Sequence, residues 1–424
     1  MRRLVPVLLR EPVFRRFWTG QTVSLFGDQV ALLAIPLTAV LILHANAAQM
    51  GYLTAAELLP SLLFSMLAGA RVDRRGGRRR TMLVADVARA VLMATIPLAY
   101  LLGALTLAQL YLVAFAVGTF DVLFFVAYNT LFVAMVPAER YVEGNSLIHG
   151  SRAMSFVGGQ SLGGILVALL SAPGAVLLNA LSFLGSAWAL ARIHPVEPPT
   201  AEPGPGQLRA GMTYIARSPI VRAALGATAT VNYFTFVFNA IFVLYATTQL
   251  HVRPAELGLV LGIGAVGGLI GATLTARVTR WIGIGPAFIL SCVVFPAPLI
   301  LVPLAAGSRP VILALLFLAE FGTGLGVMLL DISIGSIFAA VIPDHLKARV
   351  SGAYRTINYG VRPIGALSGG LLGTALGLRT TLWIAALGGV LCVLWTLPGP
   401  LRHLKRLPEA RLAATTAGAT GTGG

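Results

Sequence analysis

The chain has 424 residues, of which 57% are hydrophobic and only 11% charged, and its mean hydropathy is +0.85. Ordinary globular domains carry about 25% charged residues, so this composition excludes a water-soluble or intrinsically disordered protein. The net charge is +16. Because the basic residues stand in short clusters between apolar runs, they are typical of the loops of a membrane protein, and no nucleic-acid partner is predicted.

Twelve apolar runs are long enough to cross a bilayer as helices, since about 20 residues suffice. They are expected to start near Phe17, Met50, Met82, Leu107, Ser146, Pro173, Ile220, Ala255, Pro286, Pro310, Ala348 and Leu378. Most linkers between them are only a few residues long, so neighbouring helices are antiparallel. The sequence therefore predicts an all-α polytopic membrane protein of twelve transmembrane helices.

One proline-rich linker divides the chain near its midpoint. The predicted parts are a cytoplasmic segment 1–16, a six-helix bundle 17–193, a cytoplasmic linker 194–219, a second six-helix bundle 220–397 and a disordered cytoplasmic tail 398–424. Within the linker, Gln207 to Arg217 is expected to form a short amphipathic helix on the membrane surface.

The distribution of arginine and lysine predicts the orientation. With the N-terminus inside, the cytoplasmic segments hold 24 of these residues, whereas the outer loops hold only Arg253, Arg309 and Arg379. The excess places both termini in the cytoplasm, which requires an even number of spans. Heavy use of arginine, alanine and glycine is typical of a GC-rich genome, and we expect the bacterial cytoplasmic membrane.

The chain also matches itself at a shift of 206 residues. The matches fall in three different contexts, with 70–74 on 276–280, 132–137 on 338–343, and 163–164 on 369–370. An even number of helices separates the two copies, so both copies have the same orientation in the membrane. This predicts two pseudo-symmetric six-helix halves, as in transporters with a central site.

Two motifs resemble those of the major facilitator superfamily. Residues 69–78 read G-A-R-V-D-R-R-G-G-R, which is similar to the superfamily's loop signature G-x-L-A-D-R-x-G-R-R, although Arg71 and Gly77 depart from it. Residues 155–164 resemble the exporter motif G-x-x-x-G-P-x-x-G-G in the fifth helix through Gly159, Gly163 and Gly164.

The segments around 14–28 and 85–90 resemble the enterobactin-exporter-like branch, whose members export siderophores, macrolides and other bulky natural products with a proton gradient. The resemblance implies alternating access and a cavity lined by the first, fourth, seventh and tenth helices. It also implies that Asp73 ties its loop to a neighbouring helix end, with Lys347 or Arg349 as partner. The residues assigned to this gating loop are Gly69, Asp73, Arg74, Gly76 and Arg78.

Ionisable residues within spans are costly and are candidates for function. Asp28 lies about 16 Å into the first helix, near the midplane, and Asp121 and Glu320 lie at similar depth. All three are candidates for proton coupling, because a carboxyl group in an apolar setting can cycle a proton. The alternative for Asp28 and Asp121 is a static salt bridge with Arg152 or Arg362. The predicted charge partners within spans are Asp86, Arg89, Arg152, Arg355 and Arg362, with Asp86 and Arg89 forming a pair three residues apart.

Aromatic and amide side chains in the fourth and seventh helices suit a bulky amphipathic substrate. The residues assigned to a substrate cavity are Tyr128, Asn129, Asn232, Phe236 and Asn239, and the alternative for them is packing or lipid contact. The run Gly262 to Gly267 matches G-x-G-x-x-G but lies inside an apolar span without a preceding strand, so no dinucleotide site is predicted. Neither a cofactor nor a metal is expected.

The leading hypothesis is a proton-coupled antiporter that exports a hydrophobic or amphipathic small molecule, such as a drug or siderophore. A lipid flippase or a proton-coupled importer on the same fold is the alternative. A membrane enzyme would need a cluster of acids or histidines, and the six histidines are scattered. A receptor would not need acids at the midplane. The protein is expected to act as a monomer on its substrate and protons within the lipid bilayer.

Overall fold

The computed structural model describes residues 6–194 and 207–404, and this part of the chain contains helices and no strand. The α-helices are α1 (Pro12–Leu41), α2 (Ala47–Arg75), α3 (Arg78–Leu101), α4 (Leu107–Met135), α5 (Tyr141–Leu170), α6 (Ala172–Ala191), α7 (Gln207–Arg217), α8 (Pro219–Thr248), α9 (Pro254–Ile282), α10 (Ile284–Val294), α11 (Leu301–Leu304), α12 (Arg309–Val341), α13 (Asp344–Leu376) and α14 (Leu378–Val390). Short 3₁₀ segments are η1 (Val7–Arg10), η2 (Ala138–Arg140), η3 (Ala297–Ile300), η4 (Leu391–Trp395) and η5 (Pro400–His403).

Each of the twelve predicted runs coincides with a helical segment that begins within five residues of the expected start. Ten segments are long and apolar enough to cross a membrane, with α10, η3 and α11 forming one of them and α14 and η4 another. The remaining two, α2 and α13, have 29 and 33 residues. At 1.5 Å per residue both exceed the roughly 30 Å of a bilayer core.

Helix boundaries follow local sequence signals. The side chains of Thr106 and Ser218 accept hydrogen bonds from backbone N–H groups in the first turns of α4 and α8, which satisfies donors that a helix start leaves unpaired. Between α2 and α3 the chain turns within Gly76 and Gly77, whose φ angles are 61° and 63°. Only glycine adopts this left-handed conformation without steric cost.

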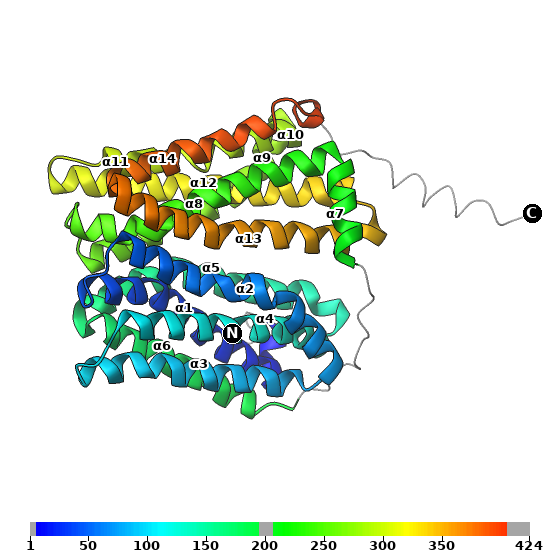
Figure 1. Cartoon of the computed structure of the whole chain (residues 1–424). Helices are drawn as coiled ribbons and strands as arrows, with labels where there is room; N and C mark the ends of the chain where they lie inside the picture. Colours follow the sequence, from blue (N-terminus) through cyan, green and yellow to red (C-terminus); the bar gives the residue numbers. More distant parts are fainter. Residues whose placement is uncertain (1–5, 195–206, 405–424) are drawn as a thin grey trace, which may run out of the picture.

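The helices form two groups with the same pattern of neighbours. In the first group α1 packs on α5 and α6, and α4 packs on α2 and α3. In the second group α8 packs on α13 and α14, and α12 packs on α9 and α10. Figure 1 shows α1–α6 on one side of the molecule and α8–α14 on the other, with α7 at one end. Equivalent neighbours in both groups agree with the duplication expected from the shift of 206 residues.

The helix predicted in the linker is present as α7. Its Gly211 lies against the backbone of Arg349, where an added Cβ would stand 2.2 Å from the carbonyl oxygen. The hydroxyl of Tyr214 donates to the carbonyl of Val341 at 2.9 Å. These contacts join α7 to α13 and to the end of α12, and we call this end of the bundle the linker end.

The two groups meet at two helix crossings far from the linker end. Gly51 of α2 lies against Gly370 of α13, and Gly164 of α5 lies against Gly258 of α9, so that a Cβ added to Gly51 or Gly164 would stand 2.8 Å from the partner's Cα. The 206-residue shift maps Gly164 onto Gly370. We call these two contacts the outer crossings. They allow the backbones to touch and thereby close the bundle at the end opposite α7.

Candidate functional site

A cavity of about 650 Å³ lies between the two groups of helices. It is lined by Gln21, Ser24, Leu25 and Asp28 of α1, by Leu58, Ser61, Leu62 and Ser65 of α2, by Arg89 of α3, by Asp121, Val122, Phe124, Phe125, Val126 and Tyr128 of α4, by Arg152 of α5, and by Gly352, Arg355, Thr356, Tyr359 and Arg362 of α13. These positions run from the middle of the helices toward the linker end. The outer crossings close the opposite end, so the cavity is accessible from the predicted cytoplasmic side.

The two groups contribute unequally to this lining. Helices α1 and α4 take part as the resemblance implies, but α8 and α12, the seventh and tenth spans, supply no described residue to it. The reason is that α13 packs directly on α8 and on α2. Among the described residues, those of the second group that line the cavity all belong to α13.

Arg89 organises the charges on the wall of the first group. Its guanidinium forms ion pairs with Asp86, three residues earlier, and with Asp121 of α4, the latter at 2.5 Å. It also lies 4.3 Å from the ring centroid of Phe124 and 4.2 Å from that of Phe183. The side chain of Asp86 is fully buried, whereas that of Asp121 is 49% exposed and faces the cavity.

The predicted pairing of Asp86 with Arg89 is confirmed. For Asp121 the alternative of a salt bridge is met, but the partners named for it were wrong, because Arg89 binds this carboxylate in place of Arg152 or Arg362. Helix depth alone did not reveal this contact, since it depends on how α3 and α4 are rotated toward each other.

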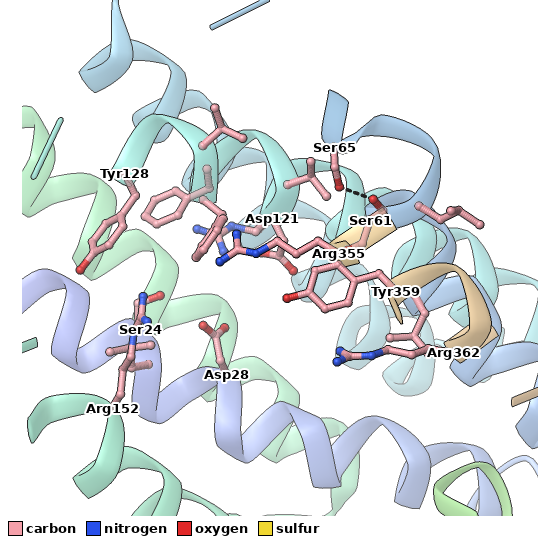
Figure 2. A pocket seen from close by; sticks show the side chains of 18 of the residues that line it. Ser24, Asp28, Ser61, Ser65, Asp121, Tyr128, Arg152, Arg355, Tyr359 and Arg362 are labelled. Atoms are coloured by element: carbon pink, nitrogen blue, oxygen red, sulfur yellow. Dashed lines mark hydrogen bonds and ion pairs between the residues drawn. The ribbon is translucent and has the colours of Figure 1, made fainter. Parts of the chain in front are cut away.

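Asp28 lies on the cavity wall at the middle of α1 (Figure 2). The preceding Gly27 lies against Asn179 and Ser182, where a Cβ would stand 2.4 and 2.1 Å from their side-chain oxygens. This close packing on α6 fixes the rotation of α1. Among the described residues no basic nitrogen lies within 4 Å of the Asp28 carboxylate, so the alternative of a static salt bridge with Arg152 or Arg362 is not met.

On α13, Arg355, Tyr359 and Arg362 share one face, since they are spaced four and three residues apart. Figure 2 shows their side chains extending into the cavity toward Asp121 and Asp28. The Nε of Arg362 donates to the Oδ1 of Asn232 at 3.1 Å, and its guanidinium lies 4.3 Å from the ring centroid of Tyr359. Tyr359 was not identified from the sequence, although its spacing from the two arginines could have indicated it.

Of the five residues assigned to a substrate cavity, only Tyr128 lines it. Asn232 and Phe236 stand behind the cavity wall and contact Arg362. Asn129 donates to the carbonyl of its own helix at Phe125, and Asn239 does not line the cavity. Asn232 and Phe236 belong to α8, and α13 packs on this helix between them and the cavity.

Arg152 of α5 reaches the cavity beside Tyr128, with its guanidinium 5.9 Å from the ring centroid. The Tyr128 ring is itself stacked on Phe17, with centroids 5.5 Å apart, and on Phe124 at 6.3 Å. This aromatic stack gives the part of the cavity nearest α5 a rigid apolar surface.

Glu320 lies outside the cavity, at the contact between α12 and α9. Its carboxylate oxygen stands 3.4 Å from the Cβ position of Gly264. The G-x-G-x-x-G run serves the same contact, since Cβ atoms on Gly264 and Gly267 would press on α12, with Gly267 2.1 Å from the carbonyl of Phe321. These glycines therefore permit a close helix crossing between α9 and α12.

The fifth-helix glycines also serve close packing. A Cβ on Gly159 would stand 2.6 Å from Gln29, and one on Gly163 would stand 3.1 Å from the Cα of Val30, while Gly164 forms an outer crossing. One helix is thus packed against α1 of its own group and against α9 of the other.

The predicted gating loop is described only in part. Arg79 donates to the carbonyls of Leu190 and Ala191 at 2.8 Å, which caps the end of α6, and Arg78 is buried. The surroundings of Gly69 and the side chains of Asp73 and Arg74 lie outside what the structure describes. Of the proposed partners, Lys347 forms an ion pair with Asp344 at 2.7 Å.

The family model of the Major Facilitator Superfamily matches the sequence of this chain over residues 17–366. The multidrug efflux pump Tap of Mycobacterium tuberculosis (strain ATCC 25618 / H37Rv) is 28% identical, with 91% of this chain and 93% of that protein covered. Tap of Mycolicibacterium fortuitum is 27% identical, over 84% of this chain and 88% of that protein. Among solved structures, that of the nucleoside transporter NupG is similar in fold, with a TM-score of 0.73, 14% identity, and coverage of 90% of this chain and 98% of that one.

Proposed function

Because this chain belongs to the Major Facilitator Superfamily and is therefore a membrane transporter, we propose that it is a proton-coupled exporter of amphipathic small molecules. Its similarity to the multidrug efflux pump Tap supports export. The observation that carries proton coupling is the presence of Asp28 and Asp121 on the wall of a mid-membrane cavity, where Asp121 is paired with the buried Arg89.

The two carboxylates differ in their surroundings. Asp121 shares Arg89 with Asp86, so its carboxylate has a fixed ion-pair partner. Asp28 has no basic partner within 4 Å among the described residues. A carboxylate without a partner in a membrane interior is costly when ionised. Asp28 is therefore the group we assign to binding and releasing the coupling proton.

Export by alternating access requires the cavity to open to each side in turn. We take the units that move to be the two predicted halves, 17–193 and 220–397. In the present state the outer crossings are closed and the cavity faces the linker end. Substrate enters from the predicted cytoplasmic side, and separation of the outer crossings releases it to the other side, where Asp28 takes up a proton.

The test is dye efflux from proteoliposomes with an imposed pH gradient. Asp28→Asn preserves the shape of a protonated carboxyl group but cannot titrate, so uphill efflux should be lost while dye binding and downhill exchange remain. Asp344→Asn is the matched control, because this carboxylate is 74% exposed at the linker end. If Asp28→Asn still concentrates dye against its gradient as well as the parent, the assignment of the proton to Asp28 is wrong.

A further inference from the structure

Three arginines that reach the cavity have no acidic partner. Arg152, Arg355 and Arg362 all line it, yet in the described part of the chain no carboxylate oxygen lies within 4 Å of their nitrogens. Arg89 is the contrast, since it is held between two aspartates. The sequence predicted all of them as charge partners within the spans, and only Arg89 fulfils that role.

Arg362 is held in place without an ion pair among the described residues. It uses its Nε to donate to Asn232 at 3.1 Å, and Asn232 in turn donates to Asn358 at 3.1 Å. The rings of Tyr359 and Phe236 lie 4.3 and 5.3 Å from the guanidinium. A guanidinium has five N–H donors, so four remain without a protein acceptor among the described residues. The contacts orient the group and leave its terminal nitrogens for a ligand.

Arg355 stands two helical turns before Arg362 on the same face of α13. Its side chain is exposed to the cavity, and it forms no hydrogen bond or ion pair with any described residue. Guanidinium groups match carboxylate, sulfonate and phosphate oxygens in paired hydrogen bonds. Two such groups with Tyr359 between them form a cationic surface on the wall of the second group.

The opposite wall carries an apolar surface beside the charged side chains of Asp28, Asp121 and Arg89. Phe124 and Phe125 of α4 and Leu58 and Leu62 of α2 contribute side chains to it. A volume of about 650 Å³ lies within the range of pockets that hold drug-sized ligands. Next to the α13 wall, where Arg355 and Arg362 have no ion-pair partner among the described residues, an anionic group is favoured over a cationic one, because the Coulomb energy is weakly screened in a low-dielectric cavity.

We propose that the cavity binds amphipathic organic anions, with the carboxylate, sulfonate or phosphate on Arg355 and Arg362 and the apolar body on the phenylalanines of α4. The proposal rests on the export function above for its physiological meaning, but binding tests it independently of transport. Similarity to multidrug pumps does not specify the charge of the ligand, whereas these arginines favour an anion.

The experiment uses two dyes on the same xanthene scaffold, anionic fluorescein and the cationic methyl ester rhodamine 123. Binding to the purified full-length protein in a neutral detergent is measured by fluorescence anisotropy. Fluorescein should bind more tightly than rhodamine 123, and Arg362→Gln or Arg355→Gln should weaken fluorescein binding about ten- to hundredfold, as expected for loss of hydrogen bonds to a charged group. Arg280→Gln is the control, since Arg280 is exposed at the end of α9.

Two further variants separate charge from geometry. Arg362→Lys keeps the charge but not the paired donors, so it should recover only part of the affinity. Asn232→Ala should weaken fluorescein binding without changing rhodamine 123 binding, because Asn232 accepts from Arg362 but does not itself line the cavity. If a variant at Arg362 unfolds, as judged by thermal unfolding in detergent, Arg355→Gln carries the test, because Arg355 forms no described contact that folding could depend on.

Tighter binding of rhodamine 123, binding of neither dye, or fluorescein binding that is unchanged in Arg355→Gln and Arg362→Gln would overturn the proposal. Lysophosphatidate as competitor distinguishes the source of the anion. If lysophosphatidate displaces bound fluorescein at concentrations lower than those at which fluorescein itself binds, this result would support the anion site and assign it to a lipid. Arginine-dependent fluorescein binding without efflux in proteoliposomes would support the site and refute the export function.

Discussion

The outer crossings provide the sharpest test of how the bundle closes. Gly164→Ala adds a methyl group 2.4 Å from the carbonyl oxygen of Pro254 and 2.8 Å from the Cα of Gly258. Both contacts are with backbone, so no side chain can rotate away, and overpacking of this kind costs about 1–3 kcal/mol. Because the crossing exists only while this end is closed, that cost falls on the closed state. The equilibrium should shift toward the open state by about 5- to 150-fold.

The matched control lies in the same helix. Gly150 also belongs to α5, but a Cβ added there meets no atom within 4 Å. Gly150→Ala therefore changes the helix propensity by the same amount, about 1 kcal/mol, without touching the other half. On α13 the corresponding pair is Gly370→Ala and Gly352→Ala, since a Cβ at Gly352 likewise meets nothing within 4 Å.

The assay measures the distance between two spin labels, one at Asn46 and one at His251, in the loops that follow α1 and α8. The buried Cys292 and Cys392 are first replaced by serine, so that only the introduced cysteines are labelled. Gly164→Ala and Gly370→Ala should each populate a longer distance, and the double variant should add the two effects because the crossings are separate. The reasoning is refuted if Gly164→Ala gives the same distance distribution as Gly150→Ala.

Two further predictions concern charge. Arg89→Met leaves the buried Asp86 without its partner, which should destabilise the protein by about 3–5 kcal/mol. Thermal unfolding in detergent measures this loss. The double variant that also carries Asp86→Asn should recover part of the lost stability. Equal unfolding temperatures for Arg89→Met and the parent would contradict the role of the ion pair. Asp73→Asn should leave expression intact but slow transport and change the labelling of cysteine probes on the periplasmic side. Unchanged transport would indicate that the basic loop only sets the membrane orientation and that Asp73 has no gating role.

The positions of the spans could be predicted because they depend on local sequence. Every apolar run became a helix, and the linker helix at Gln207–Arg217 began and ended at the expected residues. Composition and depth therefore sufficed for fold class and for the placement of Asp28 and Asp121 near the middle of the bundle. Both carboxylates do line the cavity.

The pairing of Asp86 with Arg89 could be predicted because both lie on one helix, whereas partners on different helices and the cavity walls could not, because they depend on helix rotation. Glu320 has the same depth as Asp28, yet it faces Gly264 of α9 and not the cavity. Asn232 lies in a helix expected to line the cavity, but α13 stands between them and Asn232 instead supports Arg362. Depth along a helix is read from residue number, whereas rotation is set by tertiary contacts such as those of Gly27 with α6.

Charge arithmetic connects the proton site to the proposed anion site and yields a last prediction. If each cycle exports an anion with at least one negative charge and imports one proton, at least two positive charges move inward. Each charge is worth about 2.3 kcal/mol per 100 mV, so an interior-negative potential of that size would supply about 5 kcal/mol, equivalent to roughly a thousandfold gradient. Exchange of a proton for a monovalent cation would move no net charge.

Fluorescein efflux from proteoliposomes should therefore accelerate when valinomycin and a potassium gradient set an interior-negative potential without a pH gradient, and Arg280→Gln should behave like the parent. Fluorescein efflux that does not respond to the potential would show that the anion and the proton are not exchanged in this way.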